Sequence, residues 1–380
     1  MAKHRTWVEI SEEALQNNIY ELRALLRPET EFAAVVKSNA YGHSLEQVVP
    51  MMSKVAVKRF AVDNINEALL VRELAPEASI NVIGYIMHEQ LAEAIEAGIE
   101  LTVYDKDTIR LVEEIARQRK QIVSIHLKLD TGMSRQGVLP QNLSDVVTLL
   151  LDCPHLTVAG VSTHFANLDN YRDPSFTLMQ CELYEQCIEQ IELAGFHPQF
   201  LHCAKSSAII LYPNTQGTLV RAGIALYGIW PTPDIQDEAR RQSIKCSLKP
   251  VLSWKTRVIQ VKSLPTGTPI SYDLTEALRK PSRIAVLPIG YYDNFDRKLS
   301  SIGEVLIKGY RCKVLGRVCM NMTMVDVSSV PDVKPEQEAI IIGASGRHQI
   351  TAQEIADKIG TIPYEVVSRI SPTIPRVAVE

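Results

Sequence analysis

The sequence contains no apolar run long enough to cross a membrane. No stretch approaches the roughly 18 uninterrupted apolar residues of a transmembrane helix. The opening MAKHRTWVEISEEAL also lacks the apolar core of a secretory signal peptide. These absences predict a cytoplasmic protein that does not associate with membranes.

Several familiar cofactor and metal motifs are missing as well. The seven cysteines, an odd number, form no C-x-x-C pair, which argues against a disulfide framework and a zinc ribbon. There is no H-E-x-x-H, no G-x-G-x-x-G and no Walker A loop. A metalloprotease, a Rossmann dehydrogenase and a P-loop NTPase therefore lack their signatures, and we expect no metal ion.

The charge is nearly balanced, with 40 Lys and Arg against 44 Asp and Glu and a formal net charge of -4. No basic block of the kind that follows a phosphate backbone occurs, so we expect no nucleic-acid partner. The 380 residues are 46% hydrophobic, which is typical of a folded protein with two or three domains.

The first two thirds of the chain repeats one unit, a short β-branched apolar run followed by a turn and an amphipathic helix. Eight such units in a row predict an α/β fold with an N-terminal (β/α)8 barrel, because this barrel closes with eight strands in about 250 residues. We place this barrel at residues 1–235. The expected strands are Phe32–Val36, Arg59–Val62, Ile80–Tyr85, Leu101–Tyr104, Ile122–Leu129, Thr157–Thr163, Phe200–Cys203 and Leu219–Ala222.

After Tyr227 the pattern changes. Pro231, Pro233 and the polar run IQDEARRQS are interpreted as a linker. The following segments are rich in β-branched residues and separated by Gly, Pro and Asp turns, which predicts a C-terminal mainly β domain at residues 236–380. One helix is expected within it, at Ala352–Ile359.

Barrel active sites lie at the C-terminal ends of the strands. The first strand stops at Lys37, with Tyr41 one short loop away. A lone lysine here could equally be a surface residue that caps the strand. Later strand ends add further polar and ionisable groups, namely Lys128, Asp130, Arg135, Ser162, His164 and His202.

The loops after strands seven and eight of such barrels commonly bind phosphate. Here they hold Ser206, Ser207, Gly223 and Ile224. A lysine opposite a phosphate site suits pyridoxal 5'-phosphate, whose aldehyde forms a Schiff base with an amine. A sugar phosphate fits the same spacing, so the pattern alone leaves both open.

Five segments resemble one enzyme family and occur in the same order: AVVKSNAYGH, KLDTGMSRQG, RAGIALYG at 221–228, GYYDNFDRKLS and GRVCMNM. They are similar to alanine racemase, a fold-type III pyridoxal phosphate enzyme, and the resemblance covers nearly the whole chain. It implies pyridoxal phosphate-dependent interconversion of L- and D-alanine, with D-alanine used for peptidoglycan. It also implies a homodimer in which the C-terminal domain contributes to the partner's active site.

Position by position, the resemblance implies that Lys37 holds the cofactor and acts as one base. Tyr272 would be the second base, on the opposite face of Cα, assisted by His164 and Arg221. Arg221 would also face the pyridine nitrogen, unless it forms a salt bridge within the barrel, and His164 could instead be a structural residue. The phosphate would bind to Tyr41, Ser206, Gly223, Ile224 and Tyr364.

Arg135 would contact the substrate carboxylate or the phenolic oxygen of the cofactor. The backbone of Met320 would also meet the substrate carboxylate, and Tyr291 and Tyr292 would line the entrance. The family lysine at position 128 is often carbamylated, although a plain buried ion pair is the equal alternative for Lys128. For Met320 the alternative is a packed core methionine.

Some positions depart from the family pattern. Glycine is usual at Asp273 and Asn294, asparagine at Lys205, aspartate at Asn321, alanine at Tyr292 and arginine at Thr373. Because several lie near the entrance, a racemase of serine or of broader specificity remains an alternative. A decarboxylase would have a glutamate in place of Arg221, and a non-catalytic pyridoxal phosphate carrier would lack the β domain.

Overall fold

The computed structural model describes residues 4–380, which form two compact units. The barrel unit comprises residues 15–38 and 49–249, and the β unit comprises residues 4–14, 39–48 and 250–380. Within the described residues, no helix is long and apolar enough to cross a membrane.

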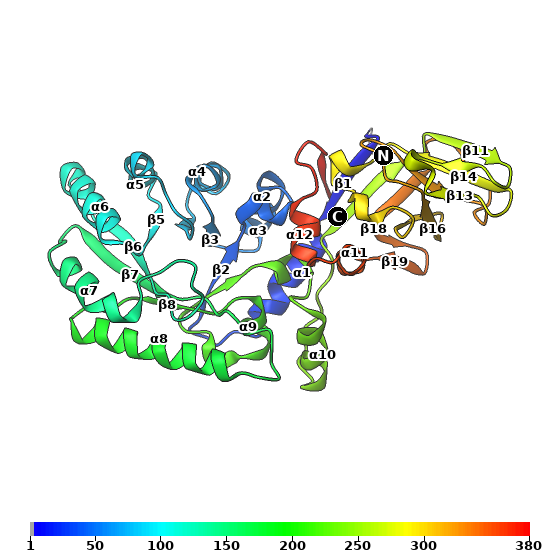
Figure 1. The fold of residues 1–380 in the computed structure, drawn as a ribbon. Coiled ribbons are helices and arrows are strands. Elements are labelled where there is room, and N and C mark those ends of the chain that lie inside the picture. The colour runs from blue at the N-terminus through cyan, green and yellow to red at the C-terminus, as the bar shows by residue number, and fades with distance from the viewer. Residues whose placement is uncertain (1–3) are drawn as a thin grey trace. The chain divides into compact units, whose positions relative to one another are not determined.

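Eight parallel strands form the barrel in the order β8-β7-β6-β5-β4-β3-β2-β9 (Figure 1). The N–H of Thr218 donates to Leu201 O at 3.1 Å and that of Arg221 to Ala204 O at 3.0 Å, which joins the last strand to the segment of β8 and closes the ring. The predicted (β/α)8 barrel is confirmed. Its strands are β2 (Glu31–Val35), β3 (Arg59–Val62), β4 (Ser79–Val82), β5 (Glu100–Val103), β6 (Val123–Lys128), β7 (Leu156–Ser162), β8 (Phe200–His202) and β9 (Leu219–Ala222).

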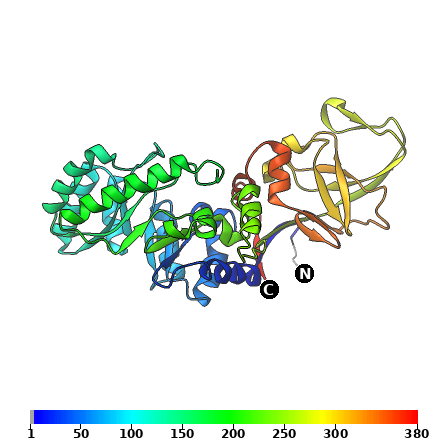
Figure 2. The ribbon, with the colours of Figure 1, turned by 90° about the horizontal axis from the view of Figure 1, so that it is seen from below.

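Helices follow the strands and lie outside them; the long green helix in Figure 2 is α8. Side-chain caps fix where two of them begin: Asn64 accepts from Glu67 N at 3.0 Å, and Asp105 accepts from Thr108 N at 2.8 Å. The helices are α1 (Glu12–Arg23), α2 (Lys37–Tyr41), α3 (Leu45–Lys54), α4 (Ile65–Leu74), α5 (Leu91–Glu96), α6 (Lys106–Arg119), α7 (Leu143–Leu151), α8 (Ser175–Leu193), α9 (Ser206–Leu211) and α10 (Pro233–Arg241).

The linker predicted after Tyr227 is wrong, because that segment forms helix α10. Thr232 caps it by accepting from Ile235 N at 3.2 Å, and Pro233 occupies the first turn, where no backbone donor is needed. Ile235 and Ala239 are buried. The run looked polar because the buried face of a three-turn helix needs only a few apolar residues.

The β unit is built on one large sheet in the order β11-β14-β17-β16-β15-β18-β10-β1-β20, with β19 beside β18 and a separate pair β12-β13. These strands are β1 (Thr6–Ser11), β10 (Leu252–Arg257), β11 (Gln260–Leu264), β12 (Pro269–Ile270), β13 (Glu276–Ala277), β14 (Ser282–Leu287), β15 (Glu304–Ile307), β16 (Tyr310–Leu315), β17 (Thr323–Asp326), β18 (Glu338–Ser345), β19 (His348–Ile350) and β20 (Arg376–Val379).

Two helices complete the β unit, α11 (Ala352–Ile359) and α12 (Pro363–Ser368). The first has the predicted bounds. Residues Thr6–Ser11, for which no strand is predicted from the sequence, form strand β1, in which Trp7 pairs with Lys255 of β10 and Val8 with Arg376 of β20.

Candidate active site

The polar residues predicted at the strand ends of the barrel do share one end of it. Lys128, Ser162 and His202 are the last residues of β6, β7 and β8, and Arg221 lies on β9. Lys37 follows β2, whose residue Ala33 pairs with Arg221. Because all eight strands are parallel, their C-terminal ends meet at one rim, where barrel enzymes carry their chemistry.

Lys37 is neither buried nor fully exposed, since its side chain is 34% accessible and Nζ lies 3.4 Å from Asp63 Oδ1. The backbone after it is unusual. The residues from Ser38 to Tyr41 all have φ between 52° and 56°, which is one turn of left-handed helix made without glycine. This conformation costs about 1–2 kcal/mol per residue, and strain of this kind concentrates at functional sites.

The barrel rim is rich in cations. Lys128 is only 9% exposed, and burial followed by the charges of Arg221 and Arg135 holds its pKa well below the usual range. Burial, then Arg221, Lys128, Arg135 and Lys205, lowers the pKa of His164 to about 2. The imidazole is therefore neutral, and the rim favours anionic ligands.

Arg221 is buried and held by three hydrogen bonds. Nη1 contacts His202 Nδ1 at 2.5 Å and donates to His202 O at 2.6 Å, and Nη2 donates to Thr163 O at 2.8 Å. These partners are an imidazole and two carbonyls rather than a carboxylate. These contacts are therefore hydrogen bonds and not the salt bridge within the barrel that was the alternative for Arg221.

Ser206 connects the two loops predicted to bind phosphate. Its buried Oγ accepts from Gly223 N at 3.0 Å and from Ala225 N at 3.4 Å. Ser206 begins α9, and Ile224 begins the 3-10 turn Ile224–Tyr227, so two helical first turns start here. First-turn N–H groups have no partner within their helix, and with the rim cations they suit a phosphate.

Lys205, one of the departures from the family pattern, is bound to a neighbour within the barrel unit. Its Nζ lies 2.7 Å from Asp169 Oδ2, and Ser207 also hydrogen-bonds to Asp169. The positive charge of Lys205 is thus largely compensated by the carboxylate of Asp169, which was not among the predicted site residues.

Four of the predicted site residues lie in the β unit. The rings of Tyr41 and Tyr364 are neighbours there, with centroids 6.2 Å apart and planes tilted by 50°. Gly42 next to Tyr41 has φ of +81°, and a Cβ at this position would lie 2.2 Å from Val367 O of α12. Close packing of α12 against this turn brings the two tyrosines together.

Tyr272 and Met320 lie on adjacent loops of the β unit. Ser271 Oγ donates to Arg317 O at 2.6 Å and lies 3.4 Å from Cys319 Sγ, which ties the two loops together. Tyr272 is 67% exposed and Met320 54% exposed. The core alternative for Met320 is therefore wrong for the single chain.

The predicted entrance residues border the same loops. The N–H groups of Tyr291 and Tyr292 donate to Cys319 O and Met320 O, each at 3.0 Å. A Cβ on Gly290 would lie only 2.1 Å from Cys319 O, so the two segments can approach this closely only with glycine there.

Two of the departures have a conformational reason. Asp273 has φ of +61° and Asn294 has φ of +72°. Both occupy the left-handed region, where glycine is the usual residue and Asp and Asn are the best tolerated alternatives. Asp and Asn are therefore compatible with the left-handed backbone at these two positions.

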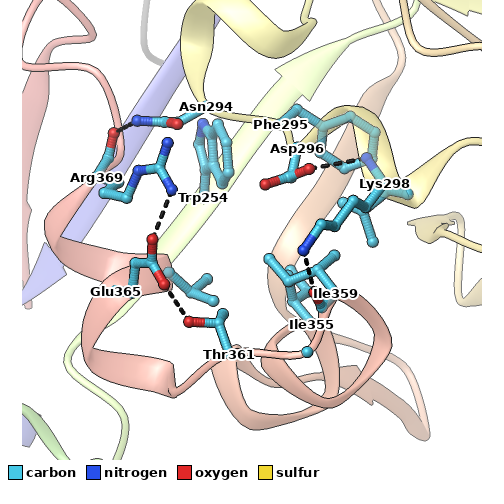
Figure 3. A pocket seen from close by; sticks show the side chains of 13 residues that line it. Trp254, Asn294, Phe295, Asp296, Lys298, Ile355, Ile359, Thr361, Glu365 and Arg369 are labelled. Atoms are coloured by element: carbon cyan, nitrogen blue, oxygen red, sulfur yellow. Dashed lines mark hydrogen bonds and ion pairs between the residues drawn. The ribbon is translucent and has the colours of Figure 1, made fainter.

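A separate pocket lies in the β unit between α11, α12 and the segment after Gly290 (Figure 3). Its charged groups are already paired, since Arg369 Nη1 contacts Glu365 at 2.6 Å and Lys298 Nζ donates to Ile359 O at 2.9 Å. None of the predicted site residues lines it. Within residues 4–380 there is also no cluster of side chains arranged to hold a metal ion.

The fold and the rim together define a class, a (β/α)8 barrel protein with a strand-end lysine, a buried arginine at the same rim and an added β domain. Family models identify it further: the alanine racemase N-terminal domain matches residues 10–231, and the alanine racemase C-terminal domain matches residues 251–378. The chain belongs to the alanine racemase family, whose members are pyridoxal phosphate-dependent isomerases.

Individual relatives agree with this assignment. An alanine racemase of Methanococcus maripaludis is 37% identical, and the match covers 99% of each chain. The structure of alanine racemase from Clostridium difficile 630 superposes with a TM-score of 0.92 at 31% identity, covering 100% of this chain and 97% of that one. A Bartonella henselae alanine racemase with covalently bound pyridoxal phosphate shares the fold, with a TM-score of 0.86, 23% identity and coverage of 99% and 100%.

Proposed function

We propose that this protein racemises alanine with two bases, Lys37 of one subunit and Tyr272 of the partner subunit, on opposite faces of the substrate Cα. The observation that carries the proposal is the barrel rim, where Lys37 follows β2, the buried guanidinium of Arg221 lies on β9, and the buried Lys128 ends β6. Racemisation removes a proton from one face of Cα and delivers another to the opposite face. Two bases accomplish this without either one changing sides.

The residues present fit pyridoxal phosphate. Lys37 Nζ would hold its aldehyde carbon, and Arg221 would face its ring nitrogen. When bound, this cofactor withdraws electrons from the substrate and so acidifies the Cα proton. Its phosphate would bind to Ser206, Gly223, Ile224, Tyr41 and Tyr364.

Arg221 has a restraining role in this proposal. A guanidinium keeps its charge at any physiological pH, so it disfavours a second positive charge on the ring nitrogen. Electron withdrawal is then weaker than with a carboxylate at this place. We infer that this arrangement favours proton transfer at Cα over side reactions.

Tyr272 needs help to act as a base, because the pKa of an ordinary tyrosine is about 10. A neutral His164, whose pKa is about 2, has one ring N–H with which to stabilise the phenolate of the partner's Tyr272. Arg221, which lies near enough to His164 to lower this pKa, adds positive charge.

The substrate carboxylate would contact the guanidinium of Arg135 and the backbone N–H of Met320 of the partner subunit. We also propose that Lys128 is carbamylated. Its lowered pKa favours the neutral amine, whose nitrogen attacks the carbon of carbon dioxide, forms the N–C bond and releases a proton. The resulting anion would offset the charges of Arg221 and Arg135.

A homodimer is part of the proposal. In the single chain, large apolar side chains around the loops of Tyr272 and Met320 are exposed, among them Leu274, Tyr292 and Met322. Exposed apolar groups gathered in this way are typical of a protein interface. We further propose that the enzyme works in the cytoplasm and supplies D-alanine for peptidoglycan.

Two variants test the bases. Lys37→Ala should abolish the covalent link to the cofactor, seen in its absorbance, together with turnover. Tyr272→Phe should keep the absorbance and lower kcat by about a hundredfold or more, the usual contribution of a general base.

The decisive readout for Tyr272→Phe is hydrogen exchange at Cα in heavy water, because the enantiomers have equal free energy and their kcat/KM values must fall together. One enantiomer should continue to exchange without inversion, through Lys37, while exchange from the other stops. Equal exchange from both enantiomers would contradict the opposite-face assignment.

A further inference from the structure

A chain of buried hydrogen bonds runs through the barrel behind Arg221. From Arg221 Nη1 it passes to His202 Nδ1 at 2.5 Å, and from His202 Nε2 to His126 Nδ1 at 2.8 Å. His126 Nε2 then contacts Glu100 Oε2 at 3.0 Å. Since Glu100 is the first residue of β5 and His202 the last of β8, the chain connects the two ends of the barrel.

The two ends of this chain fix the direction of every bond in it. A guanidinium only donates, so His202 Nδ1 must accept and its hydrogen must be on Nε2. That hydrogen points to His126 Nδ1, which accepts and leaves the His126 hydrogen on Nε2. An ionised carboxylate only accepts, so Glu100 receives that last hydrogen, and each histidine has one allowed tautomer.

The charge states agree with this direction. Burial, followed by the charge of Arg221, holds the pKa of His202 well below its usual value, so its ring is neutral. Burial raises the pKa of Glu100, but the hydrogen bond from His126 and the charge and hydrogen bonds of Arg59 act in the opposite direction, and the pKa is lowered overall. Glu100 is therefore ionised.

Glu100 is itself held firmly at its end of the barrel. Arg59 Nη1 lies 2.7 and 2.8 Å from the two carboxylate oxygens. The Arg59 guanidinium lies 4.1 Å above the ring of Phe200, and the ring of His126 is stacked parallel to Phe200 with centroids 6.0 Å apart. Cation–π contact and stacking immobilise both partners of Glu100.

Gly160 of β7 provides the space for this chain. A Cβ at this position would lie 2.4 Å from His126 Nδ1, the atom that accepts from His202. Any larger residue would push the His126 ring away from His202. The absence of a side chain at Gly160 therefore leaves room for the hydrogen bond between His126 and His202.

We propose that Glu100 and His126 are positioning residues for the racemase, which hold His202 in its Nε2–H tautomer and so keep Arg221 fixed toward the cofactor ring nitrogen. The inference rests on the proposed role of Arg221. With its hydrogen on Nδ1 instead, His202 would point a donor at the Arg221 donor, and the guanidinium would have to move.

Glu100→Gln is the sharpest perturbation, because it keeps the shape but introduces a donor. The new amide N–H must face either Arg59 or His126, and both neighbours donate. When it faces His126, the hydrogens of His126 and His202 shift to Nδ1, and the conflict reaches Arg221. Glu113→Gln is the matched control, since Glu113 Oε1 lies 2.7 Å from His155 Nδ1 in a partly buried pair that does not lead to Arg221.

The experiment is nitrogen NMR of the holoenzyme with isotope-labelled histidine, combined with cofactor absorbance, kcat and KM for alanine. The wild-type protein should show His126 and His202 each as a single neutral Nε2–H tautomer. Glu100→Gln should populate the other tautomer, shift the cofactor absorbance and lower kcat about tenfold, a loss typical of outer partners of a site, with less change in KM. Glu113→Gln should match the wild type in all four readouts.

Two results would overturn the proposal. The first is a wild-type His202 with its hydrogen on Nδ1, a measurement that requires no variant to fold. The second is a shift of tautomers in Glu100→Gln that leaves kcat and absorbance unchanged. The first result does not depend on the proposed reaction, and the absorbance readout of the second does not either. Failure of the proposed reaction itself would appear as absence of racemisation by the wild-type enzyme, whatever its tautomers.

Discussion

The loop that carries Tyr272 contains residues with positive φ, and replacing Asp273 should show how far the position of Tyr272 depends on them. Ser271 and Asp273 flank Tyr272 with φ of 66° and 61°. Because Tyr272 is largely exposed, few side-chain contacts hold it, and its position depends on this backbone. We compare Asp273→Gly with Asp273→Val, which should differ in both stability and activity.

The expected magnitudes follow from the geometry. A left-handed conformation costs an ordinary residue about 1–2 kcal/mol, and a β-branched residue lies at the high end. The Asp273 carboxylate is 3.6 Å from Arg317 Nε and 3.8 Å from Arg297 Nη2, but these exposed pairs contribute at most about 0.5 kcal/mol. Because Asp273 already bears about 1 kcal/mol of this strain, Asp273→Val should cost about 1.5 kcal/mol.

Glycine should behave differently. It relieves about 1 kcal/mol of strain but makes the unfolded chain more flexible by about the same free energy. Asp273→Gly should remain within about 0.5 kcal/mol of the wild type. Urea unfolding measures both variants, and a displaced loop in Asp273→Val should lower kcat about tenfold, because active sites tolerate little misplacement.

Asp332 provides the control for this comparison. It is exposed and left-handed, with φ of 46°, and lies in a turn away from the Tyr272 loop. Asp332→Val should lose similar stability and keep the wild-type kcat. If Asp273→Val were as stable as Asp273→Gly, the conformational explanation for the departure from glycine would be refuted.

Three further predictions concern capping, pH and the phosphate site. Thr351→Ala should destabilise the protein by about 1 kcal/mol, since Thr351 Oγ1 accepts from Glu354 N at the start of α11; an unchanged urea midpoint would contradict this. The hydrogen bond from Arg311 holds the pKa of Glu354 below its usual value. The stability advantage of wild type over Glu354→Gln should therefore be full above the unfolded pKa of about 4.3 and vanish as the pH falls through the folded pKa; a constant difference between pH 7 and pH 3 would exclude this coupling. Ser206→Ala should weaken cofactor binding about tenfold, because a buried partner of Gly223 N is lost; an unchanged Kd in an absorbance titration would remove Ser206 from the phosphate site.

The barrel could be predicted because its signal is local. Each strand is a short apolar run and each helix has its own periodicity, so eight repeats identify the closed sheet before any contact is known. Helix α10 was missed because its buried face includes Glu238, which is held by hydrogen bonds from Arg241 and Gln242. A buried carboxylate looks like a solvent-exposed residue in the sequence.

Strand β1 was missed for a different reason. Its partners lie about 250 residues away on β10 and in the last residues of the chain on β20. No local pattern reports a pairing at that distance. A six-residue strand directly before a helix of twelve residues is also difficult to distinguish from the start of that helix in the sequence.

The site was predictable in part. The strand-end rule found Lys37, Lys128 and His202, because parallel strands bring their C-terminal ends together, and the family resemblance added Arg221. His126 was overlooked, although it lies two residues before Lys128 on the same strand and therefore on the same face. The left-handed turn after Lys37 and the pair of Lys205 with Asp169 depend on tertiary contacts, which the order of residue types does not reveal.

The central claim, racemisation of alanine by two bases on opposite faces, is tested most directly by following the Cα hydrogen in the first turnovers. Wild-type enzyme with pyridoxal phosphate is given L-alanine in heavy water, and both enantiomers are isolated early. We expect D-alanine that carries solvent deuterium at Cα, alongside L-alanine that keeps its own hydrogen. D-alanine that retains the hydrogen of the substrate would show that one base serves both faces and would refute the two-base mechanism.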